Sequence, residues 1–283
     1  MSLYAIGDLH LPGGQEKPMA VFGSQWDRHF QKIAESWQAQ VQPEDTVLIP
    51  GDISWAMTLE EAMPDLRAIG RMPGKKILVR GNHDYWWGGI GRVRDALPEG
   101  MYALQQDALD LGDFVICGTR GWTIPTEENP LSPPDEKIYL RELARLDLAL
   151  GAARRIAPEK PLAVMLHYPP LYQNLRHSGF TERMEQAGVQ LCVYGHLHGS
   201  GIAAGFSGEQ NGIRYELTSC DSQDFAVRKI NFLSQFKIFD FQNRSSETEL
   251  RFCYTKYGHT QLESVLSDCC ILQIYYVIIT KST

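Results

Sequence analysis

Several signatures of common protein classes are missing from this chain. It has 283 residues and a formal net charge of −7, and it contains no run of lysine and arginine. Binding to nucleic acid through its phosphates requires clustered basic residues, so the composition disfavours a nucleic-acid partner. The longest apolar stretch, from Cys269 to Ile279, is interrupted by Gln273 and is too short to span a bilayer. We therefore expect no membrane association.

Paired cysteines are also absent. The six cysteines are scattered, and no two of them form a C-x-x-C pair, which argues against a zinc ribbon or a redox motif. Cys117, Cys192 and Cys220 lie in or beside apolar runs, where we expect reduced thiols that pack as small hydrophobic groups. The first residues enter an apolar run at Leu3, with no charged segment leading into a hydrophobic one, so we expect no secretory signal. These features predict a cytoplasmic protein.

Signatures of three enzyme classes are missing as well. The chain has no G-x-S-x-G elbow of a serine hydrolase and no P-loop lysine motif. It also lacks the H-x-H-x-D-H run expected of a metallo-β-lactamase-like hydrolase. The chemistry therefore has to come from another set of residues.

Five short motifs rich in metal-binding side chains follow one another along the chain. Four of the five come directly after a short apolar run of the kind that forms a strand. The motifs are Gly7-Asp8-Leu9-His10, Gly51-Asp52, Gly81-Asn82-His83-Asp84, His167 and Gly195-His196-Leu197-His198. The spacing of two between paired ligands would place both on the same side of an extended backbone. The glycines permit sharp turns and close approach of backbone to an ion.

This series resembles the calcineurin-like metallophosphoesterase family, whose pattern is D-x-H, G-D, G-N-H-D/E, H and G-H-x-H. The match covers residues 8–198, and five pieces in the family's order are a far stronger signal than any one of them. The resemblance implies two divalent transition-metal ions. Their ligands would be Asp8, His10, Asp52, Asn82, His167, His196 and His198.

Within that resemblance, Asp8, His10, Asp52 and His198 would hold the first ion, and Asp52, Asn82, His167 and His196 the second. A bridging role suits Asp52 because a carboxylate has two oxygens with spare lone pairs. The mixed nitrogen and oxygen set suits Mn, Fe or Zn.

The implied reaction is hydrolysis of a small phosphorylated substrate, either a phosphomonoester or a phosphodiester. A hydroxide that bridges the two ions would attack phosphorus. His83, which is left over from the ligand set, would act as general acid or stabilise charge on the phosphoryl group, and Asp84 would orient its ring. A catalytically inactive scaffold for protein interaction is the alternative, although such members are expected to lose ligands that are all present here. His29, His177 and His259 lie outside the motifs and are interpreted as non-ligands.

Other candidates carry a weaker signal. Tyr85, Trp86 or Trp87 could wall the pocket and stack on a base or ring of the substrate, and a place in the core is at least an equal alternative. Trp55 and Trp122 are similar cases. Arg120 and Arg176, with His177, could touch a substrate phosphate, but ordinary surface positions are the simpler interpretation.

The apolar runs alternate with helical patterns, which predicts an α/β fold. Strands are expected at residues 3–6, 46–49, 76–79, 114–117, 162–166, 190–194 and 213–218, the last on the far side of the core. Helices are expected at 25–40, 59–69 and 90–97 and around Leu140–Leu150, with a proline-rich loop at 123–135.

The resemblance implies more: two mixed β-sheets packed as a four-layer sandwich flanked by helices. Residues 1–240 would form the catalytic domain. Residues 241–283 would be a C-terminal extension of unclear role, in which the apolar alternation between Ile271 and Ile278 could form an edge strand.

Overall fold

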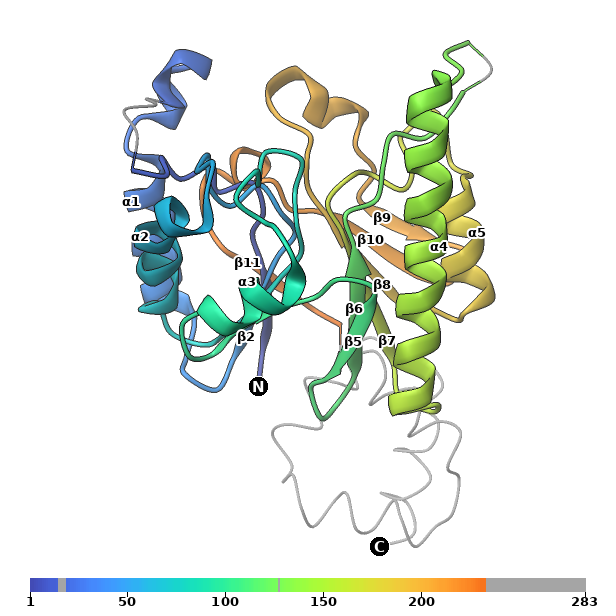
Figure 1. Cartoon of the computed structure of the whole chain (residues 1–283), viewed down its shortest axis with the longest axis horizontal. Helices are drawn as coiled ribbons and strands as arrows, with labels where there is room; N and C mark the ends of the chain where they lie inside the picture. The colour runs from blue at the N-terminus through green and yellow to red at the C-terminus, as the bar shows by residue number, and fades with distance from the viewer. Residues whose placement is uncertain (15–18, 127, 233–283) are drawn as a thin grey trace, which may run out of the picture. The chain divides into compact units, whose positions relative to one another are not determined.

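Two β-sheets form the centre of the protein (Figure 1). The computed structural model describes residues 1–14, 19–126 and 128–232, so the predicted extension and the predicted boundary at residue 240 lie outside it. The first sheet has the order β11-β1-β2-β3-β4 and the second the order β5-β6-β7-β8-β10-β9.

Each sheet has a parallel centre and at least one antiparallel edge. In the first, β1 to β4 run parallel and β11 pairs antiparallel with β1. In the second, β6, β7, β8 and β10 run parallel, with β5 and β9 antiparallel at the edges. The strands of the first sheet are β1 (Leu3–Ala5), β2 (Thr46–Ile49), β3 (Lys75–Leu78), β4 (Met101–Ala103) and β11 (Arg228–Ile230). Those of the second are β5 (Asp107–Asp110), β6 (Val115–Thr119), β7 (Leu162–Leu166), β8 (Leu191–Tyr194), β9 (Gly208–Gln210) and β10 (Ile213–Leu217).

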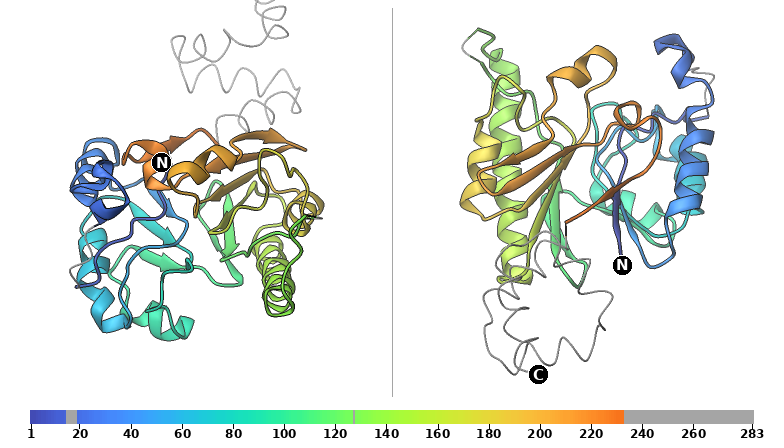
Figure 2. Two further views of the ribbon diagram at one scale, coloured as in Figure 1. Left: turned by 90° about the horizontal axis from the view of Figure 1, so that it is seen from above. Right: turned by 180° about the vertical axis from the view of Figure 1, so that it is seen from behind.

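Helices cover the outer faces of both sheets, which completes the predicted four-layer α/β sandwich (Figures 1 and 2). On the side of the first sheet lie α1 (His29–Gln40), α2 (Leu59–Gly70) and α3 (Ile90–Ala96), and on the side of the second lie α4 (Pro133–Ile156) and α5 (Gly179–Gln186). Short 3-10 helices are η1 (Met19–Phe22), η2 (Ser24–Trp26), η3 (Gly199–Ala204) and η4 (Cys220–Gln223). No helix in the described ranges is both long and apolar enough to cross a membrane.

The strands are buried on both faces. In β2, Val47 and Ile49 pack in one cluster with Ile33 and Trp37 of α1. Leu48 between them is also fully buried, and because side chains alternate along a strand, it faces the other sheet. Strands buried on both sides appear in a sequence as continuous apolar runs, which is why the central strands could be recognised.

Helix α4 begins earlier than the proline-rich loop predicted at 123–135 allows. Ser132 caps it by accepting the N–H of Asp135 at 3.3 Å, and Pro133 and Pro134 form its first turn. Proline is tolerated there because the first N–H groups of a helix have no partner within the helix. The loop therefore ends at residue 132.

Two further expectations need correction. The strand predicted on the far side of the core is β10, which instead pairs in parallel with β8, with Leu217 opposite Tyr194. Its end therefore lies at the same edge of the sheet as the end of β8. The helix predicted from residue 25 is divided, because η2 ends at Trp26 and α1 starts at His29.

Candidate metal centre

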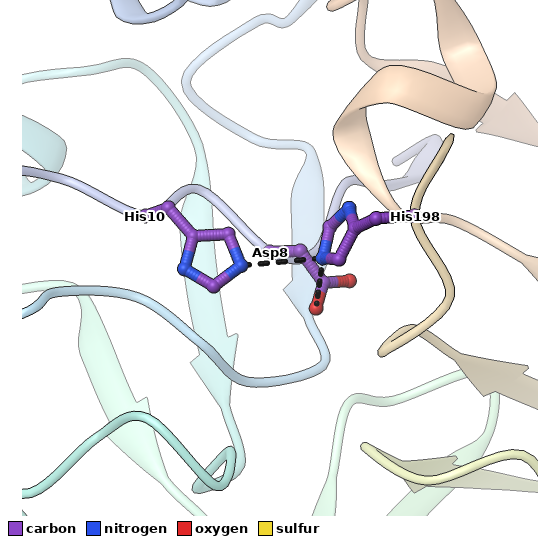
Figure 3. Close-up of side chains that lie close together, drawn as sticks. All are labelled: Asp8, His10 and His198. Atoms are coloured by element: carbon purple, nitrogen blue, oxygen red, sulfur yellow. Dashed lines mark hydrogen bonds and ion pairs between the residues drawn. The ribbon is translucent and has the colours of Figure 1, made fainter. Parts of the chain in front are cut away.

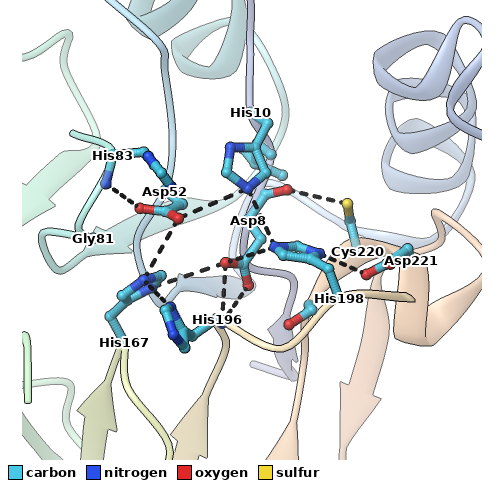
Figure 4. A network of polar contacts seen from close by, with 12 residues as sticks. Asp8, His10, Asp52, Gly81, His83, His167, His196, His198, Cys220 and Asp221 are labelled. Carbon is cyan, nitrogen blue, oxygen red and sulfur yellow. Dashed lines mark hydrogen bonds and ion pairs between the residues drawn. The ribbon is translucent and has the colours of Figure 1, made fainter. Parts of the chain in front are cut away.

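All five motifs lie at the carboxyl ends of parallel strands, where ligands gather in open α/β sheets. The first three follow β1, β2 and β3 of one sheet, and His167 and His196 follow β7 and β8 of the other. Figure 4 shows the side chains from both sheets turned toward one another. The seven predicted ligands are thus brought together, although their motifs span residues 8–198.

The first ligand group consists of Asp8, His10 and His198 (Figure 3). Nε2 of His198 lies 3.3 Å from Oδ1 of Asp8 and 3.2 Å from Nε2 of His10. Asp8 and His10 are 0% and 4% exposed, so the Asp8 carboxylate is shielded from solvent. Three donor atoms within 4.8 Å of one another can surround a single ion.

The second ligand group consists of Asn82, His167 and His196. Oδ1 of Asn82 lies 2.6 Å from Nε2 of His167 and 3.0 Å from Nδ1 of His196, and the two ring nitrogens are 3.2 Å apart. Nδ1 of His167 lies 3.0 Å from the carbonyl oxygen of Pro50, which fixes the ring with Nε2 toward the site.

Asp52 lies between the two groups. Its Oδ2 atom is 3.7 Å from Nε2 of His10 and 3.5 Å from Nε2 of His167. Its Oδ1 atom accepts the backbone N–H of His83 at 2.8 Å. One oxygen therefore faces both groups while the other is held by the backbone.

Four of the candidate ligands have left-handed backbone, which L-residues rarely adopt. The φ angles are 58° at Asp8, 45° at His10, 50° at Asp52 and 74° at His196. The extended backbone assumed for Asp8 and His10 is therefore wrong, and the two side chains meet through a strained turn instead. Strain of this kind persists where the surroundings enforce it, and it concentrates at functional sites.

Glycines are required beside these residues. A Cβ on Gly81 would lie 2.1 Å from Oδ1 of Asp52, and one on Gly195 would lie 2.2 Å from Oδ2 of Asp8. Both distances are far below van der Waals contact, so the motif glycines allow the loops to pack against the carboxylates.

Burial and charge set the protonation of the histidines. Burial lowers the pKa of His10, His167 and His196, that of His196 to about 3, so these rings are neutral at pH 7. Burial also opposes the charged form of His198, but Asp8 and Asp221 outweigh it and raise the pKa of His198 to about 10. Neutral imidazoles, carboxylates and an amide oxygen are the donor set that a divalent transition metal requires.

Asp52 is held at an electrostatic cost in this environment. Burial raises its pKa well above the ordinary value, and the charges of Asp8 and Asp84 raise it further. A cation between the carboxylates would relieve this repulsion, so the residues present fit a metal centre.

The Asp84 carboxylate has other partners than the ring it was predicted to orient. Its oxygens accept the backbone N–H groups of Gly81, Ile53 and Ser54 at 2.7, 2.8 and 3.1 Å, and the indole N–H of Trp86 at 3.0 Å. These contacts hold the loops that carry Asp52 and Asn82, and the orienting of His83 by Asp84 stays a prediction.

His83 lies on the side of the first ligand group. Its ring centroid is 5.7 Å from that of His10 and 4.4 Å from that of Trp55, and its Nδ1 is 3.5 Å from the hydroxyl of Tyr85. The side chain is partly exposed, so a substrate can reach it.

The site contains residues that the motifs did not reveal. Asp221 binds Nδ1 of His198 at 2.9 Å, and the thiol of Cys220 donates to the carbonyl oxygen of Asp8 at 3.1 Å. The ring of Trp55 stacks on His10 at 5.0 Å, and that of Tyr168 lies 4.2 Å from His196. Asp221 could have been found from its position just after a strand, had residues 213–218 been placed beside 190–194.

The weaker candidates divide between core and surface. Trp86 and Trp87 are buried in the core, whereas Tyr85 is 49% exposed beside His83. Arg176 and His177 are exposed, as expected, but the side chain of Arg120 is only 17% exposed.

His29 stays outside the ligand groups, with its Nε2 2.9 Å from the carbonyl oxygen of Leu9. Cys117, Cys192 and Cys220 are buried free thiols, as predicted.

Comparison with known proteins identifies the family of the chain. Residues 1–200 match the model of the calcineurin-like phosphoesterase family. The chain therefore belongs to that family, which consists of phosphoester hydrolases. No curated protein matches the chain.

Solved structures are similar to the chain at low sequence identity. The phosphopantetheinyl hydrolase of Mycobacterium tuberculosis is 17% identical with a TM-score of 0.52, over 81% of this chain and 95% of that one. The protein TT1561 of Thermus thermophilus is 12% identical with a TM-score of 0.49, over 81% and 98%. An archaeal phosphodiesterase is 12% identical with a TM-score of 0.38, over 81% and 99%.

Proposed function

We propose that this chain hydrolyses a small phosphomonoester or phosphodiester with two divalent transition-metal ions, Mn, Fe or Zn. The observation that carries the proposal is the close approach of ring nitrogens within each ligand group. The nitrogens of His10 and His198, and those of His167 and His196, are 3.2 Å apart in each pair. Two imidazole nitrogens this close share at most one proton, and a divalent cation bound by both nitrogens can take the place of that proton.

In this proposal Asp8, His10, Asp52 and His198 hold the first ion, and Asp52, Asn82, His167 and His196 hold the second. The position of Asp52 Oδ2, 3.7 Å from His10 and 3.5 Å from His167, supports a bridging carboxylate. When bound, the two ions would polarise the phosphoryl group and lower the pKa of a shared water, so that hydroxide is available at neutral pH. The positive charge of the two ions would exceed the negative charge of the two carboxylates. The site would therefore attract an anionic ester although the protein as a whole is acidic.

His83 supplies the proton to the leaving oxygen. Its backbone N–H donates to Oδ1 of Asp52, so its position is tied to the carboxylate between the ligand groups. Asp84 keeps this loop in place through the N–H groups of Gly81, Ile53 and Ser54. The general acid thus stands on a fixed loop with a side chain open to the substrate.

The alternative is a catalytically inactive scaffold for protein interaction. A scaffold has no need to keep every ligand, the general acid and the strained backbone at Asp8, His10, Asp52 and His196. We therefore favour the enzyme over the scaffold. The cytoplasmic location of the protein stays a prediction.

The test is hydrolysis of bis-p-nitrophenyl phosphate and p-nitrophenyl phosphate by metal-stripped protein supplied with Mn²⁺. We expect metal-dependent turnover, with a diester preference indicating a phosphodiesterase and a monoester preference a phosphatase. Asp52→Asn should abolish turnover, whereas the matched control Asp113→Asn, at an exposed position, should retain it. Wild-type protein that binds Mn²⁺ and turns over neither ester would contradict the proposal and favour the scaffold.

A further inference from the structure

Two loops beside the metal centre carry buried N–H donors without partners. Within the described part of the chain, the buried side-chain nitrogens that lack a hydrogen-bond partner are Nε of Arg80, Nε of Arg120 and Nε1 of Trp122. Arg80 directly precedes the Gly81-Asn82 motif after β3, and Arg120 and Trp122 follow β6. An unpaired buried donor costs free energy, and in native structures it calls for an ion, a water or a ligand.

The loop after β6 adjoins the second ligand group. The carbonyl oxygen of Arg120 accepts the N–H of His167 at 3.0 Å and that of Tyr168 at 2.9 Å. The ring of Tyr168 lies 4.2 Å from that of His196 and 5.0 Å from that of Trp122. Trp122 is therefore one ring away from a candidate metal ligand.

The two arginines follow strands whose ends are neighbours across the two sheets. A Cβ on Gly118 of β6 would lie 3.1 Å from Cγ1 of Val79, the residue before Arg80, so the ends of β3 and β6 are neighbours. Burial lowers the pKa of Arg120, the charge of Glu142 opposes this shift, and the positive charge of Arg80 adds to it.

The carboxylate that pairs with Arg120 is Glu142. Nη2 of Arg120 lies 3.8 Å from Oε1 of the buried Glu142. The Glu142 carboxylate also binds Arg145 at 2.6 Å and accepts the hydroxyl of Thr119 at 2.6 Å. Among the described residues, the side chain of Arg80 has no hydrogen bond or ion pair. Arg120 and Arg145 therefore share the carboxylate of Glu142, and Arg80 has no part in this pairing.

The unpaired guanidinium of Arg80 and the three unpartnered donors suit a bound anion. Arg80, Arg120 and Trp122 are all half-buried, so part of each side chain is open to solvent. Guanidinium groups bind phosphate through paired N–H donors, and they are the side chains of choice for partly buried anion sites.

We propose that Arg80, Arg120 and Trp122 form a second anion subsite, which binds a second phosphate group of the substrate beside the phosphoryl group that is hydrolysed. The inference rests on the proposed function and narrows it to phosphoesters that carry another anionic phosphate. The subsite lies on the side of the second ligand group, whereas His83 lies on the side of the first.

Calorimetric binding tests the subsite without relying on turnover. Full-length Mn²⁺-loaded protein is titrated with propylphosphonate, which has one anionic group, and with propane-1,3-diphosphonate, which has two. We expect the diphosphonate to bind about 10–100-fold more tightly, the range for added hydrogen bonds between charged groups. Arg80→Gln and Arg120→Gln should each remove most of this advantage and leave the affinity for propylphosphonate within about twofold.

Two more variants separate binding from folding. Trp122→Phe removes one N–H and keeps a ring against Tyr168, so it should reduce the advantage in part. Arg176→Gln, an exposed arginine packed on Phe206, is the matched control and should retain it in full. If Arg120→Gln unfolds because Glu142 loses a partner, Arg80→Gln and Trp122→Phe still decide the question.

Equal affinity of the wild type for the two phosphonates would overturn the subsite, as would an unchanged advantage in Arg80→Gln and Trp122→Phe. Failure to hydrolyse the nitrophenyl esters is a separate result that would count against the proposed function. The two failures are therefore distinguishable.

Discussion

Nδ1 of His198 lies 2.9 Å from Oδ1 of Asp221, while Nε2 of the same ring lies 3.3 Å from Oδ1 of Asp8. The other oxygen of Asp221 accepts the N–H of Gly199 at 2.9 Å, so the carboxylate itself is held in place. The ring is thus fixed between two carboxylates, with Nε2 directed toward the first ligand group. A carboxylate behind a histidine ligand sets its orientation and increases its basicity.

Asp221→Asn should weaken Mn²⁺ binding by about tenfold, the low end of the range for removing such a partner. Asparagine can still accept from Nδ1–H, but it no longer carries the charge that stabilises the ring. Equilibrium dialysis measures the change, and Asp224→Asn, at an exposed position in the same turn, is the control. Equal affinities of Asp221→Asn and wild type would remove Asp221 from the site.

Metal binding should release at least one proton per protein at pH 7. With its pKa raised to about 10, His198 is protonated in the metal-free protein at neutral pH, and Nε2 must lose its proton to bind an ion. The apparent affinity should therefore rise with pH until the pH passes about 10, where the ring is already neutral. Calorimetric titration in two buffers of different ionisation enthalpy counts the protons, and a heat independent of the buffer would contradict this account.

Asp52→Asn should stabilise the metal-free protein. The pKa of Asp52 in the folded protein is raised above its ordinary value. Asp52 therefore lowers the stability of the fold once the pH exceeds the pKa that its carboxyl group has in the unfolded chain. Asparagine removes the charge, can still accept the N–H of His83, and tolerates the φ of 50°. Relief of about 1 kcal/mol or more would raise the melting temperature by roughly 2–4 °C or more.

Scanning calorimetry in EDTA and again with Mn²⁺ checks this expectation. The variant should melt higher than wild type in EDTA and gain little from Mn²⁺, whereas Asp113→Asn should behave like wild type in both. A lower melting temperature of the variant in EDTA would show that the carboxylates are not in repulsion.

His83→Ala should slow turnover by about 10²–10⁴-fold, the usual contribution of a general acid. The loss should be larger for an alkyl ester than for a nitrophenyl ester, because a poor leaving oxygen depends more on protonation. Steady-state rates on both esters, with bound Mn²⁺ measured in parallel, give the comparison, and His177→Ala at an exposed position is the control. Full activity of His83→Ala on the alkyl ester would exclude the role.

The sequence predicts the centre of the fold better than its edges. The strands at residues 46–49 and 162–166 have the predicted bounds, because both are buried on two faces and form unbroken apolar runs. The edge strands β9 and β11 have only three residues each, too few for a recognisable alternation of side chains. Their pairing depends on the neighbouring strand rather than on local pattern.

The candidate ligands follow from motif order, but their surroundings do not. Motifs identify which side chains gather at the strand ends, whereas the partners of Asp84 and Asp221 depend on how separate loops pack. The left-handed backbone at Asp8 and His10 was also beyond prediction, because aspartate and histidine carry only a weak preference for it.

The most direct test of the central claim is anomalous diffraction from crystals of the Mn²⁺-loaded protein. The account predicts two manganese peaks. One should lie within bonding distance of His10 and His198, the other within bonding distance of His167 and His196, with Asp52 bound to both. A single peak, or manganese bound away from these histidines, would contradict a centre built from the two ligand groups.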